Sequence, residues 1–495
     1  MMQNTVLPNW LKKRAELSPN RIALIMNDKQ VTFQELYEYS IEYASKLHST
    51  GIQNGDSVGI LVGNRFELVV TIHALMHIGA EIVFHNIRLT SEELAWQFQD
   101  AKLKWLITED KYATKVAGTH SHRATIIMIE HISSMIVSEE LAIVKEFALN
   151  KTATIMYTSG TTGNPKGVMQ TYGNHWWSAV GSMLNLGLHE EDIWLCVVPM
   201  FHISGLSILY RSVIYGMTVV VHEQFDEEVA NLAIRKHNVT IMSVVTATLN
   251  RMIVNLGEEK YPSTLRCMLL GGGPAPLSLL EACRDKEIPV FQTYGMTETS
   301  SQIVTLSPEY SIEKLGSAGK ALFPSQLEIH VDSRLAEANE VGEIVVKGPN
   351  VTKGYANRPD ATKAAFENGW FKTGDIGYLD SDGFLFVVDR RSDLIISGGE
   401  NVYPAEIEAA LMKHEAVFEA GVTGIEDDKW GQIPVGFVVV HESAQVSLDE
   451  LQAHCQKYLA SYKVPKRIYI VKELPRNSSN KLVRRNLKQM MEAKE

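Results

Sequence analysis

The sequence predicts an α/β protein with a large N-terminal domain of layered α/β subdomains plus a β-rich subdomain, and a small α+β C-terminal domain. Apolar runs of strand length alternate with helical stretches in the first part of the chain. Short β-rich runs follow one another after Gly319, and a mixed segment follows a charged turn at 389–393. The length of 495 residues is too great for one ordinary core and indicates at least two domains.

The alternating region begins with a predicted helix at 33–47. Apolar strands are predicted next, with helical stretches between them, at 58–62, 80–84, 153–157, 193–198, 218–221, 240–245, 267–270 and 288–291. Strands that are apolar throughout are typical of sheets covered by helices on both faces. This region is therefore expected to be layered.

The β-rich region has predicted strands at 326–331, 342–347 and 384–388, with an Asp382-Gly383 turn before the last. Beyond it, Pro404 fits the first turn of a helix, and Ser447 with Glu450 has capping-box spacing. Strands at 417–422, 435–440 and 467–471 complete the C-terminal part. We expect an N-terminal domain of residues 1–389, a hinge at 390–392 and a C-terminal domain of residues 393–495.

Composition limits the classes of function. The net charge of −11 argues against general nucleic-acid binding, which needs a basic surface. No apolar stretch reaches the ~18 residues of a membrane span, and no signal peptide is evident at the start. The four cysteines form no C-x-x-C pair, which favours reduced, buried thiols and a cytoplasmic protein over a zinc or dithiol site. The sequence leaves a homo-oligomer open.

A glycine- and hydroxyl-rich loop follows the strand at 153–157. Glycines let backbone N–H groups approach phosphate oxygens, and hydroxyls and a lysine add donors and positive charge. The spacing is not that of the Walker loop, and an ordinary polar hairpin loop rarely contains so many of these residues. The phosphate-binding candidates are Thr158, Ser159, Gly160, Thr161, Thr162, Gly163 and Lys166.

A second motif, Gln292 to Thr299, follows the strand at 288–291. Tyr294 offers a ring for adenine, Thr297 a hydroxyl for phosphate, and Glu298 a carboxylate for Mg²⁺, which prefers oxygen ligands. Gly272 and Gly273, after the strand at 267–270, permit close approach of a flat ligand, although a flexible loop would look the same.

Two further motifs are weak alone. Asp375 in Lys372-Thr373-Gly374-Asp375 could accept hydrogen bonds from ribose hydroxyls, or simply form a turn. Lys481 lies in a polar loop near the end of the chain, where a lysine is usually a solvated surface charge.

Together, in this order, these motifs resemble the adenylate-forming superfamily of acyl-CoA synthetases, peptide-synthetase adenylation domains and luciferases. The resemblance runs over nearly the whole chain and includes Gly354-Tyr355 with Pro359 and Thr362. It implies an AMP-forming carboxylate–CoA ligase that uses ATP, Mg²⁺ and CoA and has a mobile C-terminal domain.

The resemblance also implies residue roles. The loop at 158–167 would cover the ATP phosphates, Tyr294 would stack on adenine, Thr297 would touch the α-phosphate, and Glu298 would hold Mg²⁺. The ribose would be held by Asp375 and Arg390, Lys481 would serve adenylation, Ser392 would be the hinge, and Gly398 and Gly399 would line the pantetheine tunnel.

Two positions depart from the superfamily pattern. Asn480 stands where glycine is common, and asparagine also tolerates a left-handed backbone. Ser392 stands where the hinge is commonly Asp or Lys.

Within the superfamily the chain is most similar to the family of 2-succinylbenzoate–CoA ligases of bacterial menaquinone synthesis, through 201–211, 271–276, 299–302 and 397–404. That substrate is an aromatic dicarboxylate. We expect His202, Ser204 and Arg211 to line its pocket, with Arg211 facing the second carboxylate. Arg211 could instead be a snorkelling arginine, and His202 a wall histidine without chemistry.

Three other readings remain. The chain could be another acyl- or aryl-CoA ligase. A peptide-synthetase adenylation module is disfavoured because His202 stands where that module has an aspartate for the substrate amino group. A nucleotide-binding regulator without chemistry is disfavoured by the joint presence of Lys166, Glu298 and Lys481.

Overall fold

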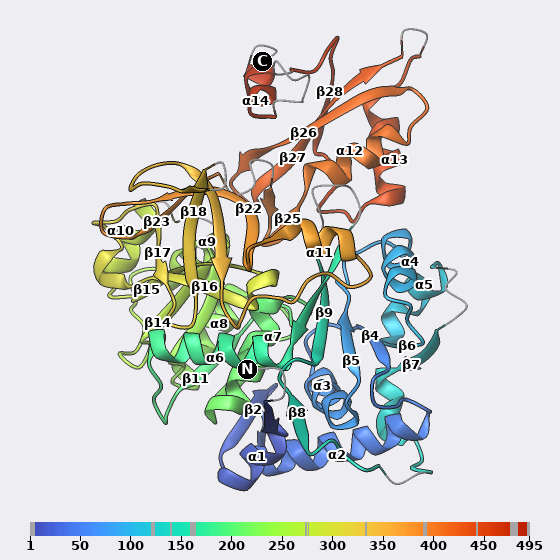
Figure 1. Ribbon diagram of the computed structural model, residues 1–495, viewed down its shortest axis with the longest axis vertical. Helices are drawn as coiled ribbons and strands as arrows, with labels where there is room; N and C mark the ends of the chain where they lie inside the picture. The colour runs from blue at the N-terminus through green and yellow to red at the C-terminus, as the bar shows by residue number, and fades with distance from the viewer. Residues whose placement is uncertain are drawn as a thin grey trace.

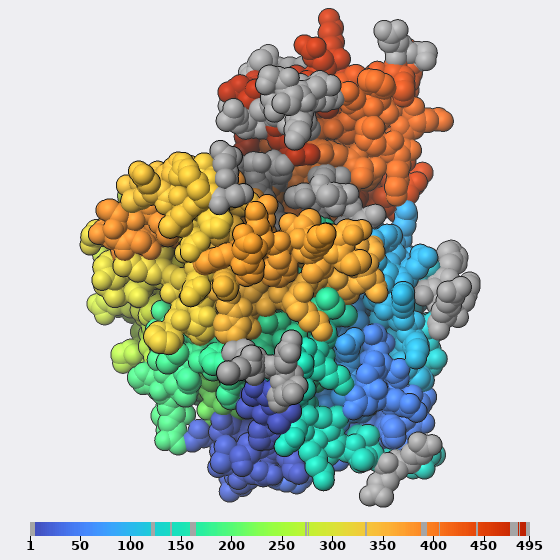
Figure 2. All heavy atoms as spheres, in the orientation of Figure 1, coloured from blue at the N-terminus to red at the C-terminus, as the bar shows by residue number. Residues whose placement is uncertain are grey.

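The computed structural model describes residues 5–119, 124–138, 141–158, 165–272, 275, 277–331, 334–389, 394–441, 444–475 and 484–492. Its elements form a mixed α/β architecture of several sheets, with a smaller C-terminal lobe resting on a larger body (Figures 1 and 2). Among the described residues, no helix is both long and apolar enough to cross a membrane.

The largest sheet has a parallel centre. Its strands there, in spatial order, are β15 (Val290–Met296), β14 (Cys267–Gly271), β13 (Ile241–Val245), β11 (Ile193–Cys196), β12 (Thr218–Val221) and β2 (Ile22–Met26). Neighbouring side chains on one strand enter different cores, with Trp194 in one and Leu195 in the other. Both faces are therefore buried, as parallel sheets require. The helices that follow its strands are α7 (Ile203–Tyr215), α8 (Glu227–Lys236), α9 (Thr246–Leu256) and α10 (Leu277–Asp285).

Antiparallel strands extend this sheet on both sides. Beyond β2 lies β3 (Lys29–Thr32), and beyond β15 lie β16 (Ser301–Leu306), β17 (Ser317–Ala321), β23 (Leu385–Asp389), β22 (Trp370–Leu379), β20 (Gly342–Lys347), β18 (Gln326–Val331) and β19 (Arg334–Leu335), with β21 (Phe366–Glu367) beside β22. Three short helices lie between these strands in the chain, namely η4 (Thr297–Thr299), η5 (Pro308–Tyr310) and α11 (Pro359–Ala365).

A second, six-stranded sheet has the order β10 (Lys166–Thr171), β9 (Thr152–Thr158), β5 (Glu81–Phe84), β4 (Ser57–Leu61), β6 (Trp105–Thr108) and β7 (Thr125–Met128). The remaining N-terminal elements are β1 (Val6–Pro8), β8 (Glu146–Ala148), α1 (Trp10–Leu17), α2 (Phe33–Ser49), α3 (Phe66–Ile78), α4 (Ser91–Asp100), η2 (Asp110–Tyr112), α5 (Ala113–Ala117), η3 (Ile129–Ser134) and α6 (Tyr172–Leu186). Helix α6 contacts α7, β10 and β16, so it ties the second sheet to the first.

The C-terminal lobe has its own five-stranded sheet and its own apolar core. The sheet contains β25 (Glu400–Val402), β24 (Ile395–Ser397), β27 (Gly431–Val440), β26 (Val417–Asp427) and β28 (Arg467–Ile470), with α12 (Pro404–Met412), α13 (Leu448–Tyr458) and α14 (Arg485–Glu492) beside it.

Most predicted elements are confirmed with small changes in their ends, but the strand predicted at 288–291 is β15, which continues to Met296 and includes the first half of the motif at 292–299. The helix predicted at 33–47 ends at Ser49, and the strands at 218–221, 326–331 and 342–347 have the predicted bounds. Pro404 begins α12, and Ser447 with Glu450 forms the capping box of α13. The strands predicted at 417–422 and 435–440 are longer, because their backbones stay paired to the hairpin tip, where Asp427 lies opposite Gly431.

Candidate active site

A cavity of about 230 Å³ lies where the carboxyl ends of β13, β14 and β15 meet the C-terminal lobe. Ligands bind at this edge of parallel sheets because the loops that leave it diverge and expose backbone groups. The cavity brings together residues that the sequence had placed far apart. Those predicted as site residues and found in its wall are Thr158, His202, Ser204, Arg211, Gly272, Thr297, Glu298, Asp375 and Gly399.

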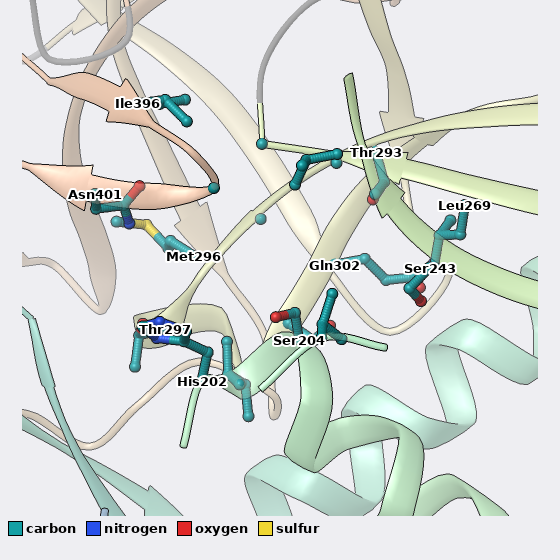
Figure 3. Close-up of a pocket in the computed structure, with 18 of the residues that line it drawn as sticks. His202, Ser204, Ser243, Leu269, Thr293, Met296, Thr297, Gln302, Ile396 and Asn401 are labelled. Atoms are coloured by element: carbon teal, nitrogen blue, oxygen red, sulfur yellow. The ribbon is translucent and has the colours of Figure 1, made fainter. Parts of the chain in front are cut away.

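Figure 3 shows the two sides of this cavity. Ile396 and Asn401, on strands of the C-terminal lobe, lie on one side. Ser243, Leu269 and Thr293, on strands of the large sheet, lie on the other. Residues of the lobe and of the body therefore both form the wall of the cavity.

The turn that carries Thr297 and Glu298 is held from outside at four successive carbonyl oxygens. These accept from Gln170 Nε2 (2.8 Å, at Thr297), the Thr352 backbone N–H (2.7 Å, at Glu298), Asn350 Nδ2 (3.1 Å, at Thr299) and Ser178 Oγ (2.5 Å, at Ser300). The backbone after the turn is strained, with φ of +54° at Ser300 and +105° at Ser301. The external donors offset this strain, which costs on the order of 1–3 kcal/mol per residue.

Glu298 and Lys166 meet at one aromatic ring. The Tyr355 hydroxyl donates to Glu298 Oε1 at 3.0 Å, and Lys166 Nζ lies 5.1 Å from the centre of the Tyr355 ring. Glu298 is only 3% exposed, yet it lines the cavity. A negative and a positive group therefore lie at the same tyrosine, although only Glu298, and not Lys166, lines the cavity.

Mg²⁺ can be accommodated at this place. Among the described residues no group of three or more His, Cys, Asp or Glu side chains could hold a metal. Mg²⁺ characteristically binds through one or two carboxylates together with substrate phosphates, rather than in an all-protein cage. A single cavity-facing carboxylate at Glu298 is consistent with that mode.

Tyr294 and Asp375 are joined by a hydrogen bond. The Tyr294 hydroxyl donates to Asp375 Oδ2 at 2.7 Å. On β15 the neighbouring Thr293 and Gly295 line the cavity, while Tyr294 packs in the apolar core of the β-rich region. Tyr294 therefore orients the carboxylate of Asp375, and its stacking on adenine stays a prediction.

The far wall of the cavity holds a buried cation. Arg211 is 2% exposed, and its guanidinium carbon lies 5.4 Å from the centre of the Trp194 ring. Its Nε and Nη2 have no hydrogen-bond partner within the part of the chain that the structure describes. Burial lowers the Arg211 pKa, and burial together with the Arg211 charge lowers the pKa of nearby His175 to about 3. An unpaired buried cation in a cavity wall calls for an anionic ligand.

The near wall contains a charged contact between lobe and body. Glu400, which is 3% exposed, accepts from Asn86 Nδ2 (3.0 Å) and pairs with Arg88 (3.0 Å) and His202 (3.1 Å). Burial alone would raise the Glu400 pKa, but the charges of His202 and Arg88 outweigh it, so that pKa is lowered. His202 thus contacts Glu400 of the opposite lobe, and its role toward the substrate stays a prediction.

A second ionic contact joins lobe and body nearby. Lys463 is 3% exposed and pairs with Glu93 of α4 at 2.6 Å and with Glu406 of α12 at 2.7 Å. Burial opposes the charge on Lys463, but the two carboxylates more than compensate and raise its pKa. A parallel pair, Lys413 with Glu92 at 3.2 Å, is half exposed at both ends.

The two glycines of the lobe differ in position. Gly399 lines the cavity, and a Cβ there would lie 3.8 Å from Val245 of the body. Gly398 lies behind it, where a Cβ would come within 2.7 Å of the Trp430 ring. Both have positive φ, +83° at Gly399 and +58° at Gly398, which favours glycine.

Several predicted site residues fall outside the described residues: Ser159, Gly160, Thr161, Thr162, Gly163, Gly273, Arg390, Ser392 and Lys481. Other contributors were missed by the sequence argument. Tyr355 and Glu400 lie in segments that carry the resemblance but were given no role, and Gln170 and Lys463 had no local signal, because their partners are remote in sequence.

Known proteins with similar sequences belong to the superfamily that the motifs resemble. Residues 11–356 match the AMP-binding enzyme family, and residues 406–481 match the AMP-binding enzyme C-terminal domain. The 2-succinylbenzoate–CoA ligase of Geobacillus sp. (strain WCH70) is 57% identical, over 98% of each chain. The corresponding ligase of Bacillus cereus (strain ATCC 14579) is 52% identical, over 98% of this chain and 99% of the relative.

Solved structures of o-succinylbenzoate CoA synthetase from Bacillus subtilis are also similar. A double mutant bound to the product analogue OSB-NCoA matches with a TM-score of 0.94 at 51% identity, over 98% of each chain. The same enzyme with the acyl-adenylate OSB-AMP matches with a TM-score of 0.77, also at 51% identity and over 98% of each chain. The chain therefore belongs to the AMP-binding enzyme family and, within it, to the 2-succinylbenzoate–CoA ligases.

Proposed function

We propose that this protein is an AMP-forming ligase that adenylates 2-succinylbenzoate with ATP and then transfers the acyl group to CoA. The products are 2-succinylbenzoyl-CoA, AMP and pyrophosphate. The observation that carries this proposal is Arg211, a buried arginine with unpaired N–H groups in the wall of the same cavity that Thr297 and Glu298 line. The chain's 57% identity to a curated ligase of this kind supports the substrate.

The first half-reaction joins two anions, a carboxylate and the α-phosphate of ATP. The carboxylate is already ionised near neutral pH, so no strong general base is needed. Bound Mg²⁺ would neutralise phosphate charge, with Glu298 as its protein ligand. Lys166, Thr297, Lys481 and the loop at 158–163 supply donors and positive charge to the phosphates, while Asp375 and Arg390 hold the ribose.

The acyl pocket must desolvate the second carboxylate of 2-succinylbenzoate. Arg211 supplies its counter-charge, and Trp194, against which the guanidinium packs, fixes the direction of that group. His202 and Ser204 line the same cavity. A monocarboxylic acid would leave Arg211 buried without a partner, which disfavours it.

The second half-reaction needs a different arrangement of the two parts. We infer that residues 1–389 and 393–495 rotate about Ser392, and that the present position serves thioester formation. Two facts support this: Gly399 and Glu400 already reach the cavity and the body, and the TM-score is higher for the product-analogue complex of the Bacillus subtilis enzyme than for its acyl-adenylate complex, 0.94 against 0.77.

The setting we propose is menaquinone biosynthesis in the cytoplasm, where ATP and CoA are available. Buried thiols, raised in pKa by burial as at Cys196, to about 12, suit a reducing compartment.

The decisive experiment measures pyrophosphate release with ATP and Mg²⁺ across a panel of carboxylic acids, followed by CoA ester formation. The panel contains 2-succinylbenzoate, benzoate, phenylpropionate and a medium-chain fatty acid. We expect kcat/KM to be highest for 2-succinylbenzoate. Preference for any monocarboxylic acid would overturn the assigned substrate and leave the ligase class intact.

A further inference from the structure

A line of buried polar side chains leads from α6 to the turn that carries Thr297. His175 Nε2 lies 2.8 Å from Thr154 Oγ1, which lies 2.8 Å from Gln170 Oε1, and Gln170 Nε2 lies 2.8 Å from the Thr297 carbonyl oxygen. None of these three side chains lines the cavity, and Thr154 and Gln170 are fully buried. The hydrogen bonds of the line therefore reach the site at the Thr297 backbone.

The hydrogen bonds of this line run in one direction. A carbonyl oxygen only accepts, so the amide nitrogen of Gln170 donates to Thr297 and its amide oxygen accepts. The single hydroxyl proton of Thr154 then goes to Gln170, and the Thr154 oxygen accepts from His175 Nε2–H. Burial lowers the His175 pKa to about 3, which keeps this ring neutral with one donor nitrogen.

We propose that Gln170 is a positioning residue for adenylation, and that it acts by donating a hydrogen bond to the Thr297 carbonyl. The inference rests on the proposed function, in which the Thr297 hydroxyl and the Glu298 carboxylate serve ATP and Mg²⁺. His175 and Thr154 act behind Gln170 by fixing which end of its amide faces the turn.

The turn depends on this donor for a physical reason. Its first carbonyl belongs to Thr297 itself, and Gln170 is the side-chain donor to that oxygen, which also accepts from the Ser300 N–H within the turn at 3.1 Å. The strained Ser300 and Ser301 lie next in the chain, so a released turn can relax away from the cavity. Displacement of reacting groups by about 1 Å can cost up to about 10²-fold in rate.

Two substitutions separate the donor from the shape of the side chain. Gln170→Met keeps the volume and removes both polar atoms, and we expect it to lower kcat for pyrophosphate release about tenfold at saturating ATP. Gln170→Glu restores the pattern only while the introduced carboxyl is protonated, because the neutral acid can donate to Thr297 and accept from Thr154. Its ionised form would place two acceptors face to face.

The readout is the pH profile of kcat from pH 6 to pH 9 for wild type and both variants. Other titratable or charged groups on elements that pack against β10 are Tyr172 and His175 of α6, Glu298 of η4, Tyr157 of β9 and Tyr355, with Lys166 on β10 itself. These groups are common to all three proteins, so their titration cancels in the ratio of the kcat of Gln170→Glu to the kcat of Gln170→Met. This ratio therefore reports the introduced carboxyl alone. We expect this ratio to exceed about five at pH 6 and never to rise with pH.

Two substitutions at Thr154 serve as a control that distinguishes loss of the hydroxyl from disruption of the fold. Thr154→Ser keeps the hydroxyl and should retain at least half the wild-type kcat, whereas Thr154→Val removes it and should fall about as far as Gln170→Met. Melting temperature and near-ultraviolet circular dichroism confirm that each variant is folded.

Two kinds of outcome bear on different claims, one on the positioning role of Gln170 and the other on the proposed function. Equal rates for Gln170→Met and wild type, or equal losses in Gln170→Met and Gln170→Glu at every pH, would overturn the positioning role. Failure of the wild type itself to release pyrophosphate with 2-succinylbenzoate would instead count against the proposed function.

Discussion

The turn at 297–300 and the contact between lobe and body border the same cavity, but they are built from different interactions. The turn is held by neutral hydrogen bonds that are buried in the body. The contact uses ion pairs, at Glu400 with Arg88 and His202 and at Lys463 with Glu93. Leaving a buried donor or acceptor without a hydrogen-bond partner costs free energy, so the hydrogen bonds of the turn stay formed. Ions that separate into water regain their hydration, so the contact can open.

This difference suggests a division of labour. We propose that the turn at 297–300 and the acyl pocket around Arg211 keep their geometry in the body, whereas the wall that meets CoA forms when the lobe docks. Variants of the charged, movable part should therefore affect one half-reaction, and variants of the fixed part should affect substrate choice or stability.

The largest effect is expected for Lys481→Ala. If this ammonium serves only adenylation, pyrophosphate release should fall roughly 10²- to 10³-fold, as for loss of one preorganised transition-state donor. Thioester formation from supplied 2-succinylbenzoyl-adenylate should stay within a factor of about two. Rapid-quench assays of each half-reaction make the measurement, and parallel losses in both would break the division of labour.

Arg211→Ala tests the fixed wall. It should lower kcat/KM for 2-succinylbenzoate roughly ten- to a hundredfold, because a buried carboxylate loses a charge-assisted partner worth about 1.5–3 kcal/mol. Benzoate-like monoacids should lose much less. Arg211→Lys should recover part of the activity, since lysine lacks the planar fork. A uniform loss across both kinds of acid would make Arg211 structural.

Glu93→Gln tests the movable contact and has a close control. The change removes the charge that meets Lys463 yet keeps the side chain at the N3 position of α4, where glutamine also suits a capping box. We expect thioester formation to slow about tenfold, because the salt bridge becomes a hydrogen bond from the Lys463 ammonium to a neutral amide oxygen, with adenylation unchanged.

Glu92→Gln is the matched control for this change. Glu92 forms a salt bridge with Lys413 that joins the same two parts but is half exposed. The rate of thioester formation should therefore change by no more than about twofold. Equal effects of the two variants on stopped-flow thioester formation would show that burial of the Glu93 pair does not matter.

The smallest effect concerns acid stability of the body. Burial lowers the pKa of His73, His77 and His175 to about 3 and that of His85 to about 4. The unfolded chain therefore binds more protons between about pH 6.5 and pH 4, and the stability present above pH 6.5 is lost as the pH falls. Each such histidine contributes at most about 1.4 kcal/mol per pH unit.

Urea unfolding at pH 7, 6 and 5 measures this slope. His85→Gln should reduce the slope of the unfolding free energy against pH by an amount that corresponds to about one bound proton. His441→Gln, at an exposed position of the lobe, should leave the slope unchanged. An unchanged slope in His85→Gln would mean that His85 is protonated in the folded protein.

Much of the fold could be predicted because its signals are local. The strands at 218–221 and 342–347 could be predicted because each contains three consecutive apolar residues, which are buried. The convergence of Thr297, Asp375 and Arg211 on one cavity was predictable only through resemblance. The roles of Gln170, Tyr355 and Lys463 were not predicted, because each role depends on a partner tens to hundreds of residues away.

The burial of all four cysteines has a practical consequence for following the lobe. Burial raises the thiol pKa of Cys283 and Cys455 to about 12, so the native sulfurs are protonated and shielded from labelling reagents near neutral pH. The combination of Glu92→Cys and Lys413→Cys would then introduce the accessible thiols, at a pair whose native side chains meet across the two parts. A bifunctional maleimide or a pair of spin labels attached there would report the docked population directly, without stripping the natural cysteines from the chain.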